Sequence, residues 1–401
     1  MSNSYLIDGI RTPIGKFGGG LATVRPDDMA ALVIKELINR NPSIDVNKIE
    51  DVILGNANGA GEENRNVARM SALLAGLPVS VPGETINRLC SSGACAVANA
   101  SKSIKVGEGD LFIAGGVESM SRAPYVVSKS GTAWARNAEM FDTSIGWRFV
   151  NPKLDSKYGT DAMGQTAENV AEQFGISRED QDQFAAWSQS KATAAKNNGR
   201  LAKEILAISI PQRKKDDLII NEDEFIREGT TAEILSKLRP AFRKEGSVTA
   251  GNASGVNDGA AALLLAGESA VKDYSLTPKA KVLSSAAAGV EPRIMGVGPI
   301  EAANKALSRA GLSFNDLDII ELNEAFSAQA LACTRSWRLD DRDSRINPNG
   351  GAIAIGHPLG MTGARLTLTA MHELIEKDKQ FALITMCVGV GQGFALVIER
   401  V

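Results

Sequence analysis

Hydrophobic and polar positions along the chain follow the same order of elements twice. In the first copy, apolar residues at helical spacing over 29–37 precede a strand-like run over 51–56. In the second copy, a stripe of small apolar residues over 303–310 ends at a glycine and precedes a similar run over 319–323. This order predicts two related halves.

The elements that follow also correspond. A helix predicted over 91–104 leads into a strand over 111–114, and a helix over 362–376 leads into a strand over 381–385. Short apolar runs that alternate with helices are typical of a parallel sheet with both faces covered. We therefore expect an internally duplicated α/β protein, although an unduplicated α/β chain would show a looser version of the pattern.

Residues 121–245 interrupt this alternation and are predicted to form an inserted lobe. The stretch holds three of the four tryptophans, a Ser-Arg-Glu-Asp capping-box helix start and a charged turn. The expected organisation is an N-terminal half over 1–120, completed by about 246–275, then the lobe, then a C-terminal half over 276–401.

Composition narrows the class of protein. The 401 residues carry 44 basic and 47 acidic side chains, a formal net charge of −3, so the chain offers no basic surface for nucleic acid or an anionic membrane. No apolar stretch is long enough to span a bilayer, and neither end reads as a targeting signal. Four cysteines make no disulfide framework. We expect a cytoplasmic enzyme.

Cys90 is the first candidate for chemistry. It lies where a short strand turns into a small-residue helix, and unpaired N–H groups at a helix N-terminus favour a thiolate. A small buried core cysteine is the ordinary alternative. His357 lies in a Gly/Pro-rich loop just before a helix, which suits a base for a cysteine nucleophile. His372 sits on a charged helix and is expected to face solvent.

Cys387 follows an apolar strand and precedes alternating glycines. Backbone N–H groups exposed there could form an oxyanion site, although a single Gly-x-Gly-x-Gly also fits a structural bend. The run leads into another strand and not a helix, so it is no dinucleotide fingerprint. Cysteine and histidine spacing matches no zinc site, so no metal is expected.

Four segments together resemble motifs of the thiolase family: 87–93, 323–326, 356–360 and 387–393. The match runs over essentially the whole chain. It implies two thiolase-type α/β halves in a five-layer αβαβα arrangement, with an inserted loop lobe that binds coenzyme A. It also implies a homotetramer, a dimer of dimers.

The resemblance implies a role for each motif residue. Cys90 would be the acylated nucleophile, and His357 would activate it. Cys387 would move a proton to or from the α-carbon of acetyl-CoA. Asn323, through a bound water, would help His357 hold the thioester oxygen of the enolate. The N–H groups of Cys90 and Gly389 would stabilise the tetrahedral oxyanion.

Coenzyme A is expected as a co-substrate, with no tightly bound cofactor. By resemblance, Ser254 contacts the pantetheine, the backbone of Ala250 packs nearby, and Arg227 holds the nucleotide, although Arg227 also reads as an ordinary surface arginine. The chain departs from the family in two places. Ala162 stands where many thiolases have histidine, and Val390 stands where glycine is common.

Three further stretches, 61–69, 143–149 and 385–391, resemble the thiolases that cleave 3-oxoadipyl-CoA in the catabolism of aromatic compounds. The implied reaction joins 3-oxoadipyl-CoA and coenzyme A to give succinyl-CoA and acetyl-CoA through an acyl-Cys90 intermediate. Two alternatives stay open: an acetyl-CoA C-acetyltransferase that acts on acetoacetyl-CoA, and a thiolase-like protein that binds acyl-CoA without turnover.

A dicarboxylic acyl chain ends in a carboxylate, which needs a cationic partner in a partly closed pocket. Arg148, in the predicted lobe, is our first candidate, followed by Arg88 and Arg65. An exposed arginine with no role is the competing interpretation.

Overall fold

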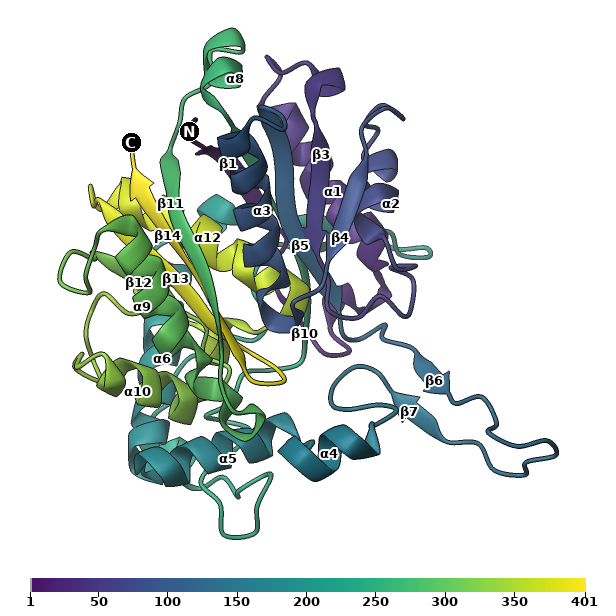
Figure 1. Cartoon of the computed structure of the whole chain (residues 1–401), viewed down its shortest axis with the longest axis vertical. Helices are drawn as coiled ribbons and strands as arrows, with labels where there is room; N and C mark the ends of the chain where they lie inside the picture. Colours follow the sequence, from purple (N-terminus) through teal and green to yellow (C-terminus); the bar gives the residue numbers. More distant parts are fainter. Residues whose placement is uncertain (1) are drawn as a thin grey trace.

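A computed structural model describes residues 2–401 (Figure 1). Its strands are β1 (Tyr5–Arg11), β2 (Gly15–Lys16), β3 (Asp51–Gly55), β4 (Gly83–Ile86), β5 (Leu111–Ser119), β6 (Tyr125–Val127), β7 (Met140–Asp142), β8 (Ile208–Ile210), β9 (Leu218–Ile220), β10 (Asn257–Ala266), β11 (Ala280–Gly289), β12 (Ile319–Leu322), β13 (Phe381–Val388) and β14 (Gln392–Arg400). Its α-helices are α1 (Pro26–Arg40), α2 (Val67–Leu74), α3 (Ser92–Val106), α4 (Pro152–Tyr158), α5 (Met163–Phe174), α6 (Arg178–Asn197), α7 (Ala232–Ser236), α8 (Glu268–Asp273), α9 (Gly298–Ala310), α10 (Ser327–Ser336), α11 (Ala352–Ile355) and α12 (Leu359–Glu376). None of the helices in residues 2–401 combines the length and the apolar character that crossing a membrane requires.

Strand order confirms the duplication. The first half contains the order β3-β5-β10-β1, and the second contains β12-β13-β14-β11. In both, the first pair is parallel and the next two pairs are antiparallel. β10 follows β5 only after a long insertion, whereas β14 follows β13 through a tight turn. The insertion is therefore the main difference between the two halves.

The expectation of a parallel sheet holds for only three of the strand pairs. Only the pairs β3/β4, β3/β5 and β12/β13 are parallel, and the other pairs of the large sheet are antiparallel. Continuous apolar runs report that both faces of a strand are buried. Here helices cover both faces of antiparallel strands as well, so the apolar runs carry no information on strand direction.

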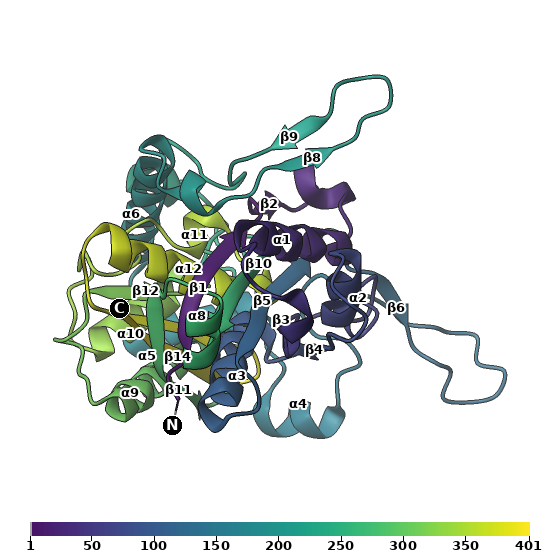
Figure 2. The same ribbon diagram turned by 90° about the horizontal axis from the view of Figure 1, so that it is seen from above.

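The elements stack in the five layers that the family resemblance implies (Figures 1 and 2). α1 and α2 cover the outer face of the N-terminal strands, and α9 covers the outer face of the C-terminal strands, with α10 packed against α9, α5 and α6. α3 and α12 lie between the two sets of strands. A short β1/β11 pairing, Tyr5 with Lys281 and Leu6 with Ala280, joins the two sets into one sheet.

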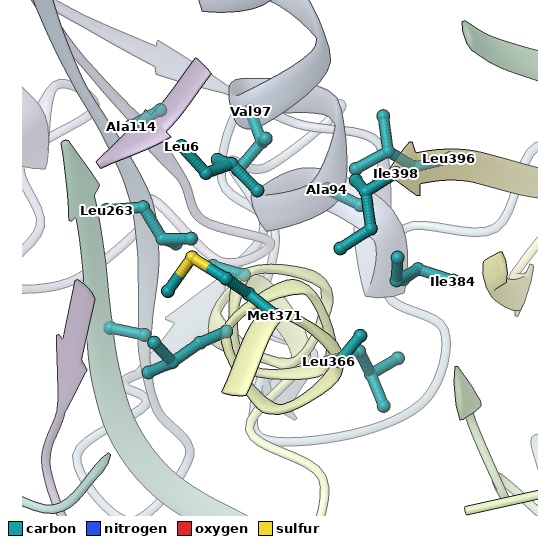
Figure 3. Close-up of a cluster of buried hydrophobic side chains, with 14 of the residues drawn as sticks. Leu6, Ala94, Val97, Ala114, Leu263, Leu366, Met371, Ile384, Leu396 and Ile398 are labelled. Carbon is teal, nitrogen blue, oxygen red and sulfur yellow. The ribbon is translucent and has the colours of Figure 1, made fainter. Parts of the chain in front are cut away.

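Side chains of α12 contribute to the core of both halves. Figure 3 shows Leu366 and Met371 of α12 between Leu263 of β10 on one side and Ile384 of β13 and Leu396 of β14 on the other. All five side chains are essentially inaccessible to solvent. Complete burial of side chains of this size contributes about 1.5–3 kcal/mol each. The middle layer therefore holds the two halves together.

Small residues let α3 and α12 approach closely at their N-terminal ends. A methyl group on Gly93 would lie 2.7 Å from the carbonyl oxygen of Gly360, and one on Gly363 would lie 2.3 Å from the backbone nitrogen of Ala94. Larger side chains would force the helices apart. The close contact brings together the segments that precede the two helices, which contain Cys90 and His357.

Buried ion pairs join the insertion between β5 and β10 to the middle layer. Arg11 of β1 pairs with Glu204 at 2.7 Å and with Asp223 at 2.7 Å, and both carboxylates belong to the insertion. Arg200, also in the insertion, pairs with Glu204 at 3.1 Å and with Glu373 of α12 at 3.2 Å. Loss of one partner would leave an uncompensated buried charge, so this network fixes the insertion against α12.

His372 does not face solvent, contrary to the expectation from its charged helix. Its side chain is half-buried, and its Nε2 atom is buried without a hydrogen-bond partner. Burial lowers the pKa of His372. The charged residues around it, including Arg200 and Glu204, belong to the buried ion network, which the sequence pattern alone does not distinguish from a solvated helix face.

Candidate active site

Cys90 lies in a sharp elbow between β4 and α3. The elbow forms one turn of 3₁₀ helix, Leu89–Ser91, and Leu89 has a φ of +47°, in the left-handed region. The Asn87 side chain accepts a hydrogen bond from the Leu89 N–H at 2.9 Å and donates one to the Ala57 carbonyl at 3.0 Å. Asn87 thus holds the residue before the nucleophile in a conformation that costs about 1–3 kcal/mol.

Burial dominates the electrostatics of Cys90. It raises the pKa of the thiol to about 11, although the N–H groups of Gly389 and of Cys90 itself point at the sulfur and act in the opposite direction. The helix N-terminus was expected to favour the thiolate. In the free site the effect of burial on the pKa outweighs that of the helix N-terminus, so the thiol is protonated at neutral pH.

Hydrogen bonds define the tautomer of His357. Its Nδ1 atom lies 2.7 Å from Thr362 Oγ1, and the Thr362 hydroxyl donates its hydrogen to the Pro358 carbonyl at 2.7 Å. Nδ1 must therefore carry the ring hydrogen, which leaves the Nε2 lone pair to accept from Asn323 Nδ2 at 3.3 Å. Burial lowers the pKa of His357 to about 3, so the ring is neutral and Nε2 is available as a base.

The backbone of the His357 loop is also fixed. The His357 N–H donates to Asn257 Oδ1 at 2.9 Å, and Asn257 Nδ2 donates to the Gly15 carbonyl at 3.0 Å. Gly356 has a φ of +111°, and a methyl group there would lie 2.7 Å from the Asn257 side chain. The imidazole is thus supported by a strand of the opposite half.

Cys387 and Gly389 come from the hairpin of the C-terminal half. Cys387 lies in β13 opposite Gly393, is buried, and has a pKa raised well above its usual value, mainly by burial and next by the nearby Cys90. Gly389 begins the turn that follows β13, and its N–H points at Cys90. Two thiols from opposite ends of the chain therefore lie at one place.

The predicted pantetheine contact lies beside the Asn323 motif. The Ser254 N–H donates to the Ala325 carbonyl at 2.9 Å. Ala250 lies on the exposed turn before it. Cys387 also belongs to a buried cluster that includes Ala253 and Phe326. This apolar wall leads from the thiols toward Ser254.

Arg227 is exposed, and its guanidinium lies 5.2 Å from the centre of the Phe225 ring. Phe225 in turn packs against Gly255, where a methyl group would lie 2.6 Å from the ring. Arg227 is thereby placed on the same side of the molecule as Ser254.

Arg148 is half-buried and connected to the catalytic loop. Its Nη2 atom donates to Asn58 Oδ1 at 3.3 Å, and the Asn58 N–H donates to Glu118 Oε1 at 3.1 Å. The other oxygen of Glu118 accepts from the Gly360 N–H at 2.8 Å, at the start of α12. The two other candidate arginines differ: Arg88 donates to Gln392, and Arg65 is exposed.

Sequence reasoning gave Glu118, Thr362 and Asn257 no role. Glu118 lies at the end of β5, is buried, and accepts backbone hydrogen bonds from Ala57, Asn58 and Gly360. Burial raises its pKa to about 7. A carboxylate at the end of an otherwise apolar strand was the available signal. The sequence carried no signal for Thr362 or Asn257. The partner of Asn257 is 100 positions away, and the contact of Thr362 with His357 depends on the conformation of one turn.

Comparisons with known proteins agree with this arrangement. The profile described as "Thiolase, N-terminal domain" matches residues 4–269, and the one described as "Thiolase, C-terminal domain" matches residues 276–400. The chain belongs to the thiolase family. This thiolase is 58% identical to a beta-ketoadipyl-CoA thiolase of Acinetobacter baylyi over 401 residues, which is 100% of both chains.

Two more relatives extend the comparison. This thiolase is 57% identical, over 100% of both chains, to the 3-oxoadipyl-CoA/3-oxo-5,6-dehydrosuberyl-CoA thiolase of Escherichia coli K12. The crystal structure of the acetyl-CoA acetyltransferase of Bacillus anthracis matches with a TM-score of 0.93 at 40% identity, covering 100% of this chain and 99% of that one. In residues 2–401 no group of three His, Cys, Asp or Glu side chains could hold a metal ion.

Proposed function

We propose that this thiolase cleaves 3-oxoadipyl-CoA with coenzyme A to give succinyl-CoA and acetyl-CoA, a step in the catabolism of aromatic compounds. The meeting of Cys90 and Cys387, with the neutral His357 on the loop that leads into the neighbouring helix α12, carries the proposal. Carbon–carbon cleavage of a β-ketoacyl thioester needs a nucleophile, a base and an acid at one carbonyl.

In the first half-reaction, the sulfur of Cys90 attacks the 3-oxo carbon while Nε2 of His357 takes the thiol proton. The carbonyl oxygen becomes an oxyanion that accepts from the N–H groups of Cys90 and Gly389. Fixed donors of this kind contribute about 3–4 kcal/mol each to the transition state.

Cleavage of the C2–C3 bond then leaves the enolate of acetyl-CoA and a succinyl thioester on Cys90. Cys387, protonated because burial raises its pKa, gives its proton to C2. Asn323, through a bound water, would help His357 hold the thioester oxygen of the enolate. The proton held by His357 passes to the Cys387 thiolate as acetyl-CoA leaves, which restores both groups. Coenzyme A next attacks the succinyl group, its thiol proton passes to His357, and the departing Cys90 sulfur takes that proton, which restores the Cys90 thiol. Ser254, Ala250 and Arg227 would hold the coenzyme A.

Arg148 would bind the distal carboxylate of the acyl chain. Its half-buried guanidinium is linked through Asn58 and Glu118 to Gly360, and only one of its donors is used in the link to Asn58. A charge-assisted hydrogen bond contributes about 1.5–3 kcal/mol, so Arg148→Met should lower kcat/KM for 3-oxoadipyl-CoA about tenfold or more.

The test compares thiolysis of 3-oxoadipyl-CoA and acetoacetyl-CoA by the parent enzyme and Arg148→Met. The expected result is a parent preference for 3-oxoadipyl-CoA that the variant loses, with little change on acetoacetyl-CoA. Arg309→Met is the matched control, because Arg309 lies on the surface and donates only to the Ser285 carbonyl. An unchanged preference in Arg148→Met would refute the role of Arg148.

The structural similarity to an acetyl-CoA acetyltransferase favours acetoacetyl-CoA as the second candidate substrate. Mass spectrometry of the peptide that contains Cys90, after separate short reactions with 3-oxoadipyl-CoA and with acetoacetyl-CoA, distinguishes the possibilities. A succinyl adduct supports the proposal. An acetyl adduct formed only from acetoacetyl-CoA supports the second candidate, and no adduct from either supports a binding protein without turnover.

We also propose a homotetramer and the division into halves and lobe given above. The β6–β7 hairpin projects from the body and exposes large apolar side chains: Tyr125, Val127, Trp134 and Met140 (Figure 1). Apolar surface of this extent favours contact with another subunit. Light scattering on the eluting peak of a sizing column should give four times the 42.4 kDa chain mass.

A further inference from the structure

Cys90 and the turn that carries Gly389 come from opposite halves, and a side-chain hydrogen bond connects the two segments. Arg88 Nη1 donates to Gln392 Oε1 at 3.0 Å, between residues 304 positions apart. Arg88 is the second residue before Cys90. Gln392 is the first residue of β14 and pairs with Val388 across the hairpin, so it closes the turn that contains Gly389.

Both segments have strained backbones. Leu89 has a φ of +47° and Val390 a φ of +63°, values that residues other than glycine rarely adopt, and a β-branched residue such as valine least of all. Each costs about 1–3 kcal/mol and persists only where the surroundings hold it. The segments also touch, because a methyl group on Gly389 would lie 3.0 Å from Leu89 Cδ1.

Arg88 is anchored on both sides of this junction. Its N–H donates to Ser92 Oγ at 2.9 Å and its carbonyl accepts from the Ser91 N–H at 3.1 Å, so its backbone is part of the elbow. Its guanidinium lies near Cys95 and reaches across to Gln392. A shift of the hairpin relative to the elbow would therefore break this bond.

We propose that the Arg88–Gln392 hydrogen bond is a positioning contact, which holds the N–H groups of Cys90 and Gly389 at the separation where both donate to the same oxyanion. The inference rests on the proposed thiolase reaction and adds two positioning residues to it. It also changes the expectation for Arg88, which acts through the oxyanion donors and does not bind the substrate carboxylate.

Steady-state kinetics of Arg88→Met, Gln392→Met and the double variant test the proposal, with 3-oxoadipyl-CoA and acetoacetyl-CoA as substrates. Displacement of a donor by about 1 Å costs up to about 100-fold in rate. The expected result is a 10- to 100-fold loss of kcat on both substrates, with KM changed less than about threefold. The double variant should be no slower than the slower single variant, since both remove one bond.

Two further variants separate positioning from folding. Gln392→Glu keeps an oxygen acceptor for the guanidinium and should restore most of the rate lost in Gln392→Met. Arg309→Met removes a surface arginine that donates to a backbone carbonyl at 2.6 Å, and it should behave as the parent. Thermal unfolding shows that each variant is folded. If Arg88→Met does not fold, the pair Gln392→Met and Gln392→Glu carries the test.

Three results would overturn the proposal: kcat within twofold of the parent in both single variants, losses that multiply in the double variant, or a loss confined to KM for 3-oxoadipyl-CoA. The last would assign Arg88 to the substrate carboxylate. Inactivity of the parent on both substrates would instead overturn the proposed function. In that case the rate of alkylation of Cys90 by iodoacetamide, compared between the parent, Arg88→Met and Gln392→Met, tests positioning alone. Withdrawal of the Gly389 N–H should slow the alkylation of both variants several-fold, and rates equal to that of the parent would contradict the inference.

Discussion

Gly363→Ala tests whether the close contact of α3 and α12 sets the geometry of the site. The added methyl carbon would lie 2.3 Å from the backbone nitrogen of Ala94 and 2.7 Å from its Cβ atom. Ordinary contacts between heavy atoms are about 3.5–4.0 Å, so the helices must separate by roughly 1 Å. Overpacking of this kind costs about 1–3 kcal/mol, and the better helix propensity of alanine offsets up to about 1 kcal/mol.

The separation moves Cys90 away from His357, because each residue lies two positions before the first residue of one of the two helices. We expect net destabilisation of about 1–2 kcal/mol in urea unfolding and a loss of kcat of up to about 100-fold. Gly131→Ala is the control, since a methyl group there meets no atom within 4 Å. Because Gly131 lies in the β6–β7 hairpin, the control variant must also keep the mass of the parent on a sizing column. Unfolding and kcat both indistinguishable from the parent would refute the idea that helix separation controls the site.

Two further predictions concern the protonation states of the site. Burial raises the pKa of Cys90 to about 11, so its thiolate fraction is small and grows about tenfold per pH unit until that value is reached. Alkylation of the free enzyme by iodoacetamide should therefore still be accelerating at about pH 10, and a plateau near pH 9 would contradict the burial argument. Thr362→Val removes the acceptor of the His357 Nδ1 hydrogen and leaves that N–H buried and unpaired, so we expect about 1–3 kcal/mol of destabilisation and at least a tenfold lower kcat. Thr362→Ser, which keeps the hydroxyl, should lose much less, and a Thr362→Val variant with the kcat of the parent would refute the role of this hydrogen bond.

Sequence periodicity predicted the elements of the two halves well. The strand expected over 51–56 is Asp51–Gly55, and the helix expected over 362–376 is Leu359–Glu376. Strand direction could not be predicted, because apolar runs record burial and not the partner to which a strand is hydrogen-bonded. Strand ends were less well predicted: the strand expected over 111–114 continues to Ser119.

Individual motifs gave weaker predictions than their combination. Cys90 and the turn after Cys387 were each compatible with a structural role, and only the joint resemblance assigned functions to both thiols. The protonation state of Cys90 was missed, because desolvation depends on what packs around the sulfur. The sequence also could not predict that Thr362 is the hydrogen-bond partner of His357, because this contact depends on the helical turn that separates the two residues.

The shared position of α12 has a consequence for how the protein is made. A ribosome releases the N-terminal half first, yet Leu263 and its neighbours on β10 find their cover only when residues 359–376 have left the exit tunnel. Between the synthesis of β10 and that of α12 the nascent polypeptide therefore exposes an apolar surface, a condition that promotes aggregation. Rapid overproduction should thus yield inclusion bodies. Slower synthesis at low temperature, or a chaperone that covers this surface until translation ends, should reduce them.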